Sequence, residues 1–193
     1  MIRLASERDV PEILGIYAPY ILHSTVTFEC TVPTQEEFLE RFRKSADAFP
    51  WLVWEEKGRI LGYACGSLPF TREAFCWCAG ASIYLCPDAQ RKGIGTRLYR
   101  ALEECLKAQG YLVIYAVITD ENTGSAAFHE SLGYTLRAAL PKCGYKFRRW
   151  VGVLWMEKRL GSPEPPARPP VRWSGFVELN EKFTDVLDKI SLF

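Results

Sequence analysis

The sequence predicts an α/β fold, in which strands and helices alternate along the chain. Residues 82–109 read as a strand, a glycine-containing loop and a helix, because β-prone residues precede Pro87 and apolar residues recur at helical spacing after Gly95. Residues 111–118 follow as a strongly β-branched strand, and this order implies parallel pairing through a right-handed crossover. Residues 51–67 add an antiparallel hairpin whose turn contains glycine.

The first elements are a short strand and a helix. Residues 2–4 form the strand, after which Asp9 and Glu12 have the spacing of a capping box with proline in the first turn. The helix that they start is predicted to end near Tyr17. A loop or short extended segment at residues 25–28 then leads to Glu29.

Two later helices are also marked by capping residues. Thr34 and Glu37 repeat the capping box before a helix with an apolar stripe. Asn122 and Ser125 can cap a short helix that carries His129. The other predicted strands are a long apolar segment at 74–85, a strand that starts at 133–134 and a last strand at 150–156.

Composition and charge exclude several classes of function. The formal net charge of +1 gives no field that would favour nucleic acid or an acidic membrane surface. No apolar run approaches the roughly 18 residues that a membrane-spanning helix needs. The first residues, Met1 to Leu4, lack the apolar region of a signal peptide, so we expect a cytoplasmic protein without nucleic-acid or membrane partners.

The seven cysteines lack the paired spacing of a zinc site, so no metal is expected. Most of them are interpreted as buried thiols. Cys76 and Cys78 would lie on one face of a strand, where two thiols can bind a metal or oxidise. With no histidine nearby they form an incomplete ligand set, which favours the simpler interpretation.

The chain is predicted to divide into three parts. Residues 1–160 form the main domain, and residues 161–175 form a proline-rich linker that cannot be helical. Residues 176–193 repeat apolar side chains at three and four residues, as in an amphipathic helix. Acidic residues on its polar face favour packing on its own domain or on a second subunit over membrane binding.

The loop at residues 90–96, Gln-Arg-Lys-Gly-Ile-Gly-Thr, predicts an anion-binding site. Its glycines allow a ligand to approach the N–H groups at the start of the helix, where the helix dipole is positive. A Walker A loop would need Gly-Lys-Ser/Thr after its spacer, and a dinucleotide fingerprint would need a third glycine in place of Leu98. Neither pattern fits, so the expected ligand is a diphosphate held by another motif.

The remaining pattern, Gln-x-x-Gly-x-Gly between a strand and a helix, resembles the pyrophosphate loop of the GNAT superfamily of N-acetyltransferases. Further phrases are similar to the phosphinothricin and methionine sulfoximine N-acetyltransferase family within it, at residues 16–21, 24–29, 82–85, 109–111, 129–134 and 144–147. The resemblance implies the GNAT acyl-CoA N-acyltransferase fold, a mixed sheet flanked by helices and splayed between its fourth and fifth strands. It also implies acetyl-CoA as co-substrate, a small-molecule amine acceptor and a homodimer.

The resemblance carries cofactor roles to particular residues of this chain. Backbone groups at a splayed strand edge are free to pair with the pantetheine amides, and one N–H can stabilise the oxyanion. The expected cofactor-binding residues are Ile83, Tyr84 and Leu85 by their backbones, Arg91, Lys92, Gly93, Ile94, Gly95 and Thr96 at the pyrophosphate, and Asn122 at the cofactor's arm.

Catalysis needs a base for the ammonium and an acid for the leaving thiolate. The resemblance places a glutamate where this chain has Gly80, so Glu29 in the resembled substrate wall is the substitute base, or else a solvated loop carboxylate. His129 or Tyr134 is expected to protonate the thiolate, although both also suit simple packing. Arg72 resembles the substrate arginine and can hold a carboxylate in a bidentate pair. The residues expected to contact the acceptor are Glu29, Arg72, Gly80, Ala81 and Ser82.

The leading interpretation is acetyl transfer from acetyl-CoA, by direct attack, to the primary amine of a small amino-acid-like acceptor. Gly80 removes the usual base, which also fits a coenzyme-A-binding module with little catalysis. Gly152 stands where the resembled family tends to have aspartate, so the acceptor pocket is expected to differ. A third interpretation is acetylation of a peptide or protein amine, with the tail as a docking element.

Overall fold

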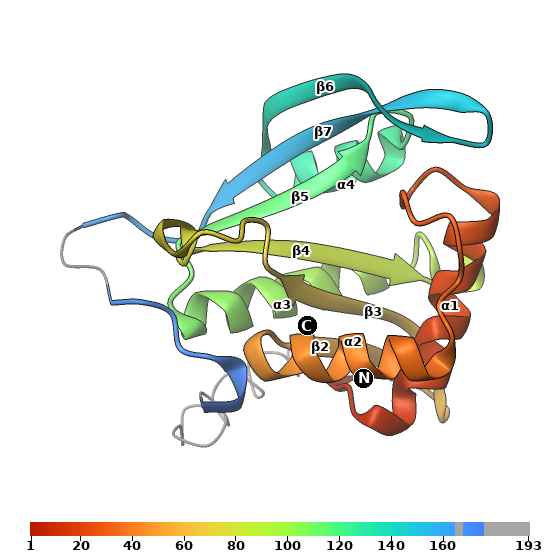
Figure 1. The fold of residues 1–193 in the computed structure, drawn as a ribbon. Coiled ribbons are helices and arrows are strands. Elements are labelled where there is room, and N and C mark those ends of the chain that lie inside the picture. The colour runs from red at the N-terminus through yellow and green to blue at the C-terminus, as the bar shows by residue number, and fades with distance from the viewer. Residues whose placement is uncertain (165–167, 176–193) are drawn as a thin grey trace.

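Seven strands form one mixed sheet in the order β1-β2-β3-β4-β5-β7-β6 (Figure 1). The computed structural model describes residues 1–164 and 168–175, so the helix predicted at 176–193 lies outside the described residues. The strands are β1 (Ile2–Leu4), β2 (Trp51–Glu56), β3 (Arg59–Ser67), β4 (Cys78–Leu85), β5 (Val113–Thr119), β6 (Thr135–Lys146) and β7 (Arg149–Arg159). The helices are α1 (Val10–His23), α2 (Gln35–Ala48), α3 (Ile94–Gln109) and α4 (Thr123–Ser131), with 3₁₀ turns η1 (Glu7–Asp9), η2 (Glu73–Phe75) and η3 (Pro87–Ala89). The predicted α/β fold, a mixed sheet flanked by helices, is confirmed.

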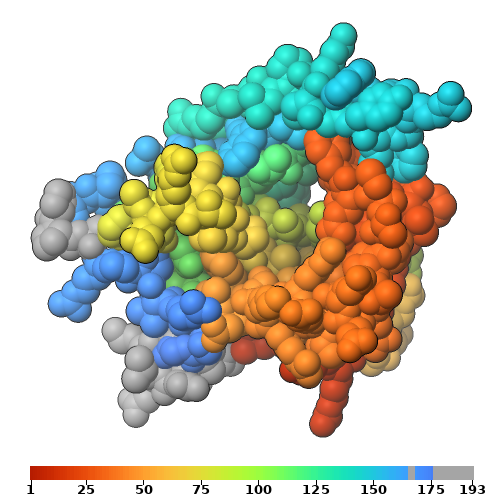
Figure 2. Space-filling model, in the orientation of Figure 1, coloured from red at the N-terminus to blue at the C-terminus, as the bar shows by residue number. Residues whose placement is uncertain are grey.

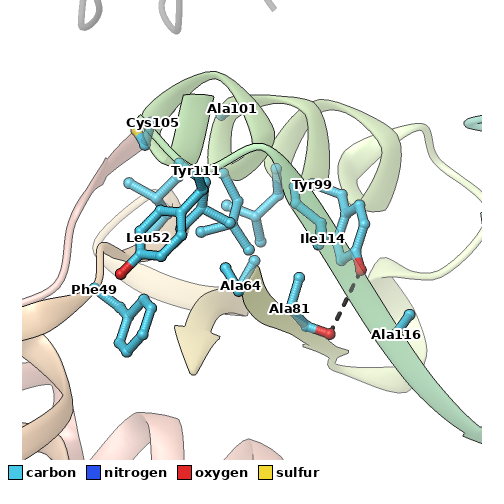
Figure 3. Packing of buried hydrophobic residues seen from close by; sticks show 14 of the residues in the cluster. Phe49, Leu52, Ala64, Ala81, Tyr99, Ala101, Cys105, Tyr111, Ile114 and Ala116 are labelled. Carbon is cyan, nitrogen blue, oxygen red and sulfur yellow. Dashed lines mark hydrogen bonds between the residues drawn. The ribbon is translucent and has the colours of Figure 1, made fainter. Parts of the chain in front are cut away.

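Helix α3 covers one face of the sheet with an apolar surface. Leu98, Leu102 and Leu106 recur at four-residue spacing and are fully buried, and each contributes about 1.5–3 kcal/mol by leaving water. Figure 3 shows Tyr99 of this helix packed in the same cluster as Ile114 of β5. The opposite face is covered by α1 and α2, as Figure 1 shows. The sheet therefore has one large core on each side.

Helix α1 extends beyond its predicted end near Tyr17. It continues through Pro19 and ends at His23. Proline lacks the N–H that would bond to the preceding turn, so it normally favours a helix end. Here Ile21 is only 1% exposed in the core beneath α1, and its burial holds the last turn in place.

The capping signatures have mixed outcomes. The predicted box of Thr34 and Glu37 is present at the start of α2, with both reciprocal hydrogen bonds formed. The box predicted for Asp9 and Glu12 is wrong, because Asp9 closes the box one turn earlier by accepting from the N–H of Ser6 at 2.7 Å. Glu12 instead accepts from a backbone N–H of β3, 3.0 Å away, and so fastens α1 to the sheet.

Strands β4 and β5 pair only over their first residues. Cys78, Ala79 and Gly80 pair in parallel with Val113, Ile114 and Tyr115, and no further pair follows. The remainder of β5 stays paired with β7 through Thr119, so β5 turns away from β4 (Figure 1). This confirms the predicted splay.

Residues 168–175, which we call the C-terminal strap, pack on the domain rather than forming a free linker. Trp173 is 5% exposed and belongs to the core beneath α3. The Gln109 side chain donates to the carbonyl of Val171 at 2.8 Å, and the N–H of Val171 returns a bond of 2.9 Å to the Gln109 carbonyl. We therefore propose that the folded domain reaches Gly175, beyond the boundary predicted at residue 160, because one buried tryptophan outweighs the local preference of a proline-rich segment.

Cys76 and Cys78 do not share a strand face. Cys76 has helical backbone angles after η2, and Cys78 is the first residue of β4, so the predicted alignment of the two thiols is wrong. Within residues 1–164 and 168–175, no three His, Cys, Asp or Glu side chains gather into a potential metal site. Among the helices described, none has the length and apolar character to cross a membrane.

Candidate active site

A cleft of about 580 Å³ lies between the open edge of β4 and the first turns of α3 and α4. Of the predicted cofactor-binding residues, those that line this cleft are Ile83, Leu85, Arg91, Gly93, Gly95, Thr96 and Asn122. Tyr84 lines a smaller neighbouring cavity, and Ile94 is buried in the core beneath α1. The structure thus brings most of these residues around one cleft.

The loop before α3 forms the anion-binding end of the cleft. Gly93 has a left-handed φ of 77° and precedes the first turn of α3, which has neither a side-chain cap nor an acidic residue. The first N–H groups of this turn therefore remain available, and the helix dipole makes the potential positive. Arg91 and Lys92 form no hydrogen bond or ion pair within the described residues. This arrangement fits the pyrophosphate of a nucleotide coenzyme.

The open edge of β4 presents backbone groups of alternate residues. The N–H of Cys86 donates to the carbonyl of Leu61 in β3 at 2.8 Å. Because antiparallel pairing alternates, the backbone groups of Tyr84 also point to β3, and those of Ile83 and Ala81 point to the splay. The backbone contacts predicted for Tyr84 are therefore directed away from the splay, whereas those predicted for Ile83 are well placed.

A small cavity of about 50 Å³ lies within the splay itself. The predicted acceptor residues Ala81 and Ser82 line it, together with Val117 of β5. Asn122 and Ser125 line both this cavity and the large cleft, so the two adjoin each other. The Asn122 side chain also caps α4 by accepting from the Ser125 N–H at 3.2 Å, which fixes the junction.

The face of the sheet opposite α3 is hollowed. Figure 2 shows the hollow between the orange segments that follow α1, the yellow loop before β4 and the cyan β6–β7 hairpin. Lys146 joins two of these walls, because its ammonium donates to the carbonyl of Thr27 at 2.8 Å. The Phe28 ring fills the space above Gly144, where a Cβ would overlap it. Burial lowers the pKa of Lys146 from its usual value. The hollow thus lies on the face of the sheet opposite α3, whereas the large cleft lies beside α3 and α4.

Glu29 lies on the loop that forms one wall of the hollow. Both oxygens of its carboxylate contact the guanidinium of Arg41, at 3.1 and 2.9 Å, and Oε1 accepts from the Tyr17 hydroxyl at 3.1 Å. Burial raises the pKa of Tyr17 to about 12, so that hydroxyl keeps its proton. These contacts therefore fix the orientation of the Glu29 carboxylate, although 36% of the side chain is exposed.

Gly80 closes the narrow end of the splay. It pairs with Ser67 of β3 and Tyr115 of β5, and a Cβ at Gly80 would lie 2.5 Å from the Ser67 hydroxyl oxygen. Any side chain here would need Ser67 to rotate. No carboxylate of the described residues lines either the cleft or the small cavity.

His129 is held on both ring nitrogens. Nδ1 lies 2.7 Å from the Ser125 carbonyl, which can only accept, so Nδ1 carries the proton in the neutral ring. Nε2 then accepts from the Tyr99 hydroxyl, 3.0 Å away. Burial lowers the pKa of His129, so the neutral form dominates at neutral pH. These contacts oppose the acid role predicted for His129, although it lines the small cavity.

We expect the lowered pKa of His129 to make stability depend on pH. Below about pH 6.5 the unfolded chain binds a proton that the folded imidazole resists, so unfolding becomes easier by at most about 1.4 kcal/mol per pH unit. Urea denaturation at pH 7 and pH 5 should show a smaller loss for His129→Asn than for the wild type. His23, the other histidine, is exposed, and His23→Asn should lose as much as the wild type.

Tyr134 lies in the core away from both cavities. It is 3% exposed, and its hydroxyl has no hydrogen-bond partner among the described residues. Burial, with Glu103 nearby, raises its pKa well above the usual value. Its ring packs against that of His129 with centroids 5.2 Å apart, and Tyr134 lines neither the cleft nor the small cavity. These positions oppose its predicted role as the acid.

Arg72 lies in the loop before β4, and its guanidinium forms no ion pair or hydrogen bond within the described residues. It lines a surface pocket of about 350 Å³ with Phe70 and Phe75. The Phe70 ring also meets Tyr115 edge-on at 5.5 Å, and Tyr115 pairs with Gly80. A free guanidinium therefore lines a pocket whose Phe70 wall contacts Tyr115, a residue paired at the narrow end of the splay.

Comparison with known protein families identifies the family of this chain. A family model described as the acetyltransferase (GNAT) domain matches residues 2–155. The chain belongs to this family. It is a GNAT N-acetyltransferase, and the family resemblance found in the sequence is confirmed.

Named relatives narrow the group within the GNAT family. The phosphinothricin N-acetyltransferase of Streptomyces viridochromogenes is 35% identical over 171 residues, covering 89% of this chain and 92% of that protein. The L-methionine sulfoximine/L-methionine sulfone acetyltransferase of Salmonella typhimurium is 31% identical, covering 86% and 97%. A GNAT superfamily phosphinothricin acetyltransferase of Sinorhizobium meliloti, solved with acetyl-CoA, superposes with a TM-score of 0.83 at 31% identity over 90% of this chain and 97% of that one.

In this GNAT chain a carboxylate lies beside Gly152, although the glycine itself has no side chain. The Gly152 N–H donates to Oδ1 of Asp120 at 3.1 Å. A Cβ at 152 would overlap the other oxygen of Asp120, at the end of β5. The missing aspartate is predicted to change the pocket, but the carboxylate of Asp120, the residue that follows β5, occupies the space beside Gly152.

Several residues of the GNAT cleft were missed in the sequence. Tyr20 and Val26 line it from α1 and the loop that follows, and Gly124 and Phe128 line it from α4. Their positions depend on how α1 and α4 pack beside β4, for which the sequence carries no local pattern. Gln90 also lines the cleft, and the sequence did indicate this residue, because it belongs to the loop motif at 90–96.

Proposed function

We propose that this GNAT enzyme transfers the acetyl group of acetyl-CoA to the primary amine of a small amino-acid-like acceptor. The observation that carries the proposal is the open edge of β4, which the large cleft reaches from the α3 face and the hollow reaches from the opposite face. Donor and acceptor can thus meet at one strand edge without competing for space. Relatives named for phosphinothricin and methionine sulfoximine acetylation support the acceptor class.

Acetyl-CoA would supply an acetyl thioester whose carbonyl carbon accepts the amine. The residues that would hold it are the amides of 93–96 and the cations Arg91 and Lys92 at the pyrophosphate, with Asn122 and Ile83 along the arm. A backbone N–H at the splay would stabilise negative charge on the thioester oxygen. In the direct reaction a C–N bond forms, the C–S bond breaks, the amine loses a proton and the sulfur leaves as a thiolate.

We assign the base to Glu29, which lies on the loop between α1 and α2 and whose carboxylate is held by Arg41 and Tyr17. Its contact with the Arg41 guanidinium at 2.9 Å holds the carboxylate in one orientation. Because Glu29 lines neither cavity, the proton would pass through water. The assay below, repeated with Glu29→Gln, tests this role: an unchanged kcat would remove it.

The test is an acceptor panel with the purified protein and acetyl-CoA. Free thiol should be released with phosphinothricin, methionine sulfoximine and related amino acids, and much less with matched amines that lack the carboxylate. Release with none of them would overturn the proposed function. Tight coenzyme binding by calorimetry without thiol release would favour the second candidate, a coenzyme-A-binding module, which the absence of a carboxylate at Gly80 supports.

We expect Arg72→Ala to raise the KM for an amino-acid acceptor about 10- to 100-fold. A charge-assisted hydrogen bond to a carboxylate is worth about 1.5–3 kcal/mol, and Arg72 has no competing partner in the described structure. The KM for acetyl-CoA should stay within about twofold, since Arg72 lies outside the large cleft. Arg100→Ala, an exposed arginine of α3, is the matched control. Equal effects of the two variants would contradict the assignment.

We also propose a homodimer that forms through the β6–β7 hairpin. Strand β6 is at the edge of the sheet, and Leu136, Tyr145 and Trp150 of the hairpin are 52%, 57% and 59% exposed. An edge strand with large apolar side chains favours association with a second copy. Light scattering should give twice the chain mass, and a monomer at micromolar concentration would contradict the dimer.

We also propose a cytoplasmic location. The free cysteines support it, and fractionation of cells can test it.

A further inference from the structure

We propose that Tyr20 is a positioning residue for the coenzyme, because its hydroxyl joins the pyrophosphate loop to the open end of β4. The inference rests on acetyl-CoA as the donor. Tyr20 lies on α1 and lines the large cleft, although nothing in the local sequence connects it with residues 90–96.

One hydroxyl makes both contacts. Its proton is donated to the Leu85 carbonyl at 2.6 Å, and its oxygen accepts from Nε2 of Gln90 at 3.3 Å. A phenol has one proton to give, so the two contacts have different directions and do not compete. The Tyr20 ring is held edge-on to the Tyr84 ring, with centroids 5.2 Å apart. Ring packing therefore aims the hydroxyl at the gap between strand and loop.

The Leu85 carbonyl needs this partner because of the splay. Alternation along β4 turns the backbone groups of Leu85 away from β3, and β5 has already separated beyond Gly80. In a continuous sheet the next strand would pair with this carbonyl. Tyr20 supplies the hydrogen bond instead, so the strand edge stays open for the coenzyme while its last carbonyl remains satisfied.

The hydrogen bond from Gln90 to the Tyr20 hydroxyl restricts the conformations of the Gln90 side chain. Gln90 is the first residue of the loop and is exposed, so its side chain has many conformations to lose when it is ordered. Tyr20 and Gln90 also border a neighbouring cavity of about 400 Å³, into which the loop has room to relax. The hydroxyl therefore fixes the position of Gln90 at the start of the loop before the coenzyme binds. This keeps the loop in place beside the first N–H groups of α3.

Tyr20→Phe tests the proposal because it keeps the ring and removes the hydroxyl. By calorimetry, the Kd for acetyl-CoA should rise about five- to tenfold, the loss expected for about one net hydrogen bond. The kcat at saturating acetyl-CoA should change by less than about twofold, because no reacting atom is touched. With S-acetylpantetheine, which lacks the pyrophosphate, kcat/KM should be the same for variant and wild type.

Two comparisons separate positioning from general damage. Gln90→Met should raise the Kd similarly, and adding Tyr20→Phe to it should raise the Kd little further, since both variants break the same link. Tyr17→Phe, on the same helix, is the control for coenzyme affinity, because its hydroxyl bonds to Thr27 and Glu29 instead. An unchanged Kd in Tyr20→Phe, or an equal loss with S-acetylpantetheine, would overturn the proposal. If the wild type does not bind acetyl-CoA, the proposed donor fails, and this role fails with it.

Discussion

Replacing Trp173 with alanine is expected to lower the free energy of unfolding by about 3–5 kcal/mol. Truncating a large buried aromatic side chain removes its transfer free energy and leaves a cavity that neighbours fill only partly. Trp173 is 5% exposed and packs in the core beneath α3, so the strap has little freedom to close the space. Urea denaturation followed by circular dichroism measures the change.

The matched control is Val171→Ala in the same strap. The Val171 side chain is 45% exposed, and its backbone hydrogen bonds to Gln109 do not depend on the side chain. Its free energy of unfolding should stay within about 0.5 kcal/mol of the wild type. If Trp173→Ala were equally silent, the strap would not be part of the folded domain. Our proposal that the domain reaches Gly175 would then be withdrawn in favour of an end near residue 160.

Gly95→Val is expected to weaken acetyl-CoA binding at least about 100-fold, a loss of about 2.7 kcal/mol. A Cβ at Gly95 would already lie 3.3 Å from Cδ1 of Leu85 and 3.7 Å from Cδ1 of Ile83. The two further methyl groups of valine would occupy the cleft between β4 and α3, where the coenzyme has to approach the backbone. Isothermal titration calorimetry measures the Kd, and circular dichroism confirms that the variant is folded.

Gly15→Val is the control, because Gly15 is also inside a helix and its Cβ would meet nothing within 4 Å. Both variants replace a helical glycine by valine, so Gly15→Val shows what this replacement does where no cleft is blocked. Equal coenzyme affinity in Gly95→Val and the wild type would place the coenzyme elsewhere.

Local patterns explain why so much of the fold was predictable. The four-residue spacing of Leu98, Leu102 and Leu106 fixes the buried face of α3, and Gly110 ends the helix with a φ of 101°. The loop at 90–96 carries its own chemistry, since glycine, cation and helix start are neighbours in sequence. These features act over one or two turns, so they can be read without knowing the rest of the chain.

The predictions that the structure corrected or opposed depend on distant contacts. His129 and Tyr134 each have the right chemistry for an acid, but burial beside Tyr99 decides their protonation and their access to the splay. The proline-rich segment gives a linker signal, and only packing in the core reveals the use of Trp173. At position 152 the sequence shows only that the family's aspartate is replaced by glycine. The structure shows that the Asp120 carboxylate, directly after β5, occupies the space beside it.

The sequence by itself determined the α/β class, the anion-binding loop and the acetyltransferase family, because spacing and short motifs are properties of neighbouring residues. Only the tertiary structure decided how β5 leaves β4 after Gly80 and how Tyr20 meets Leu85, 65 residues further along the chain. The physical reason is that a strand edge acquires free hydrogen-bonding groups only when its neighbour is placed elsewhere. That placement is set by the packing of β5 on β7 and of α1 on β4.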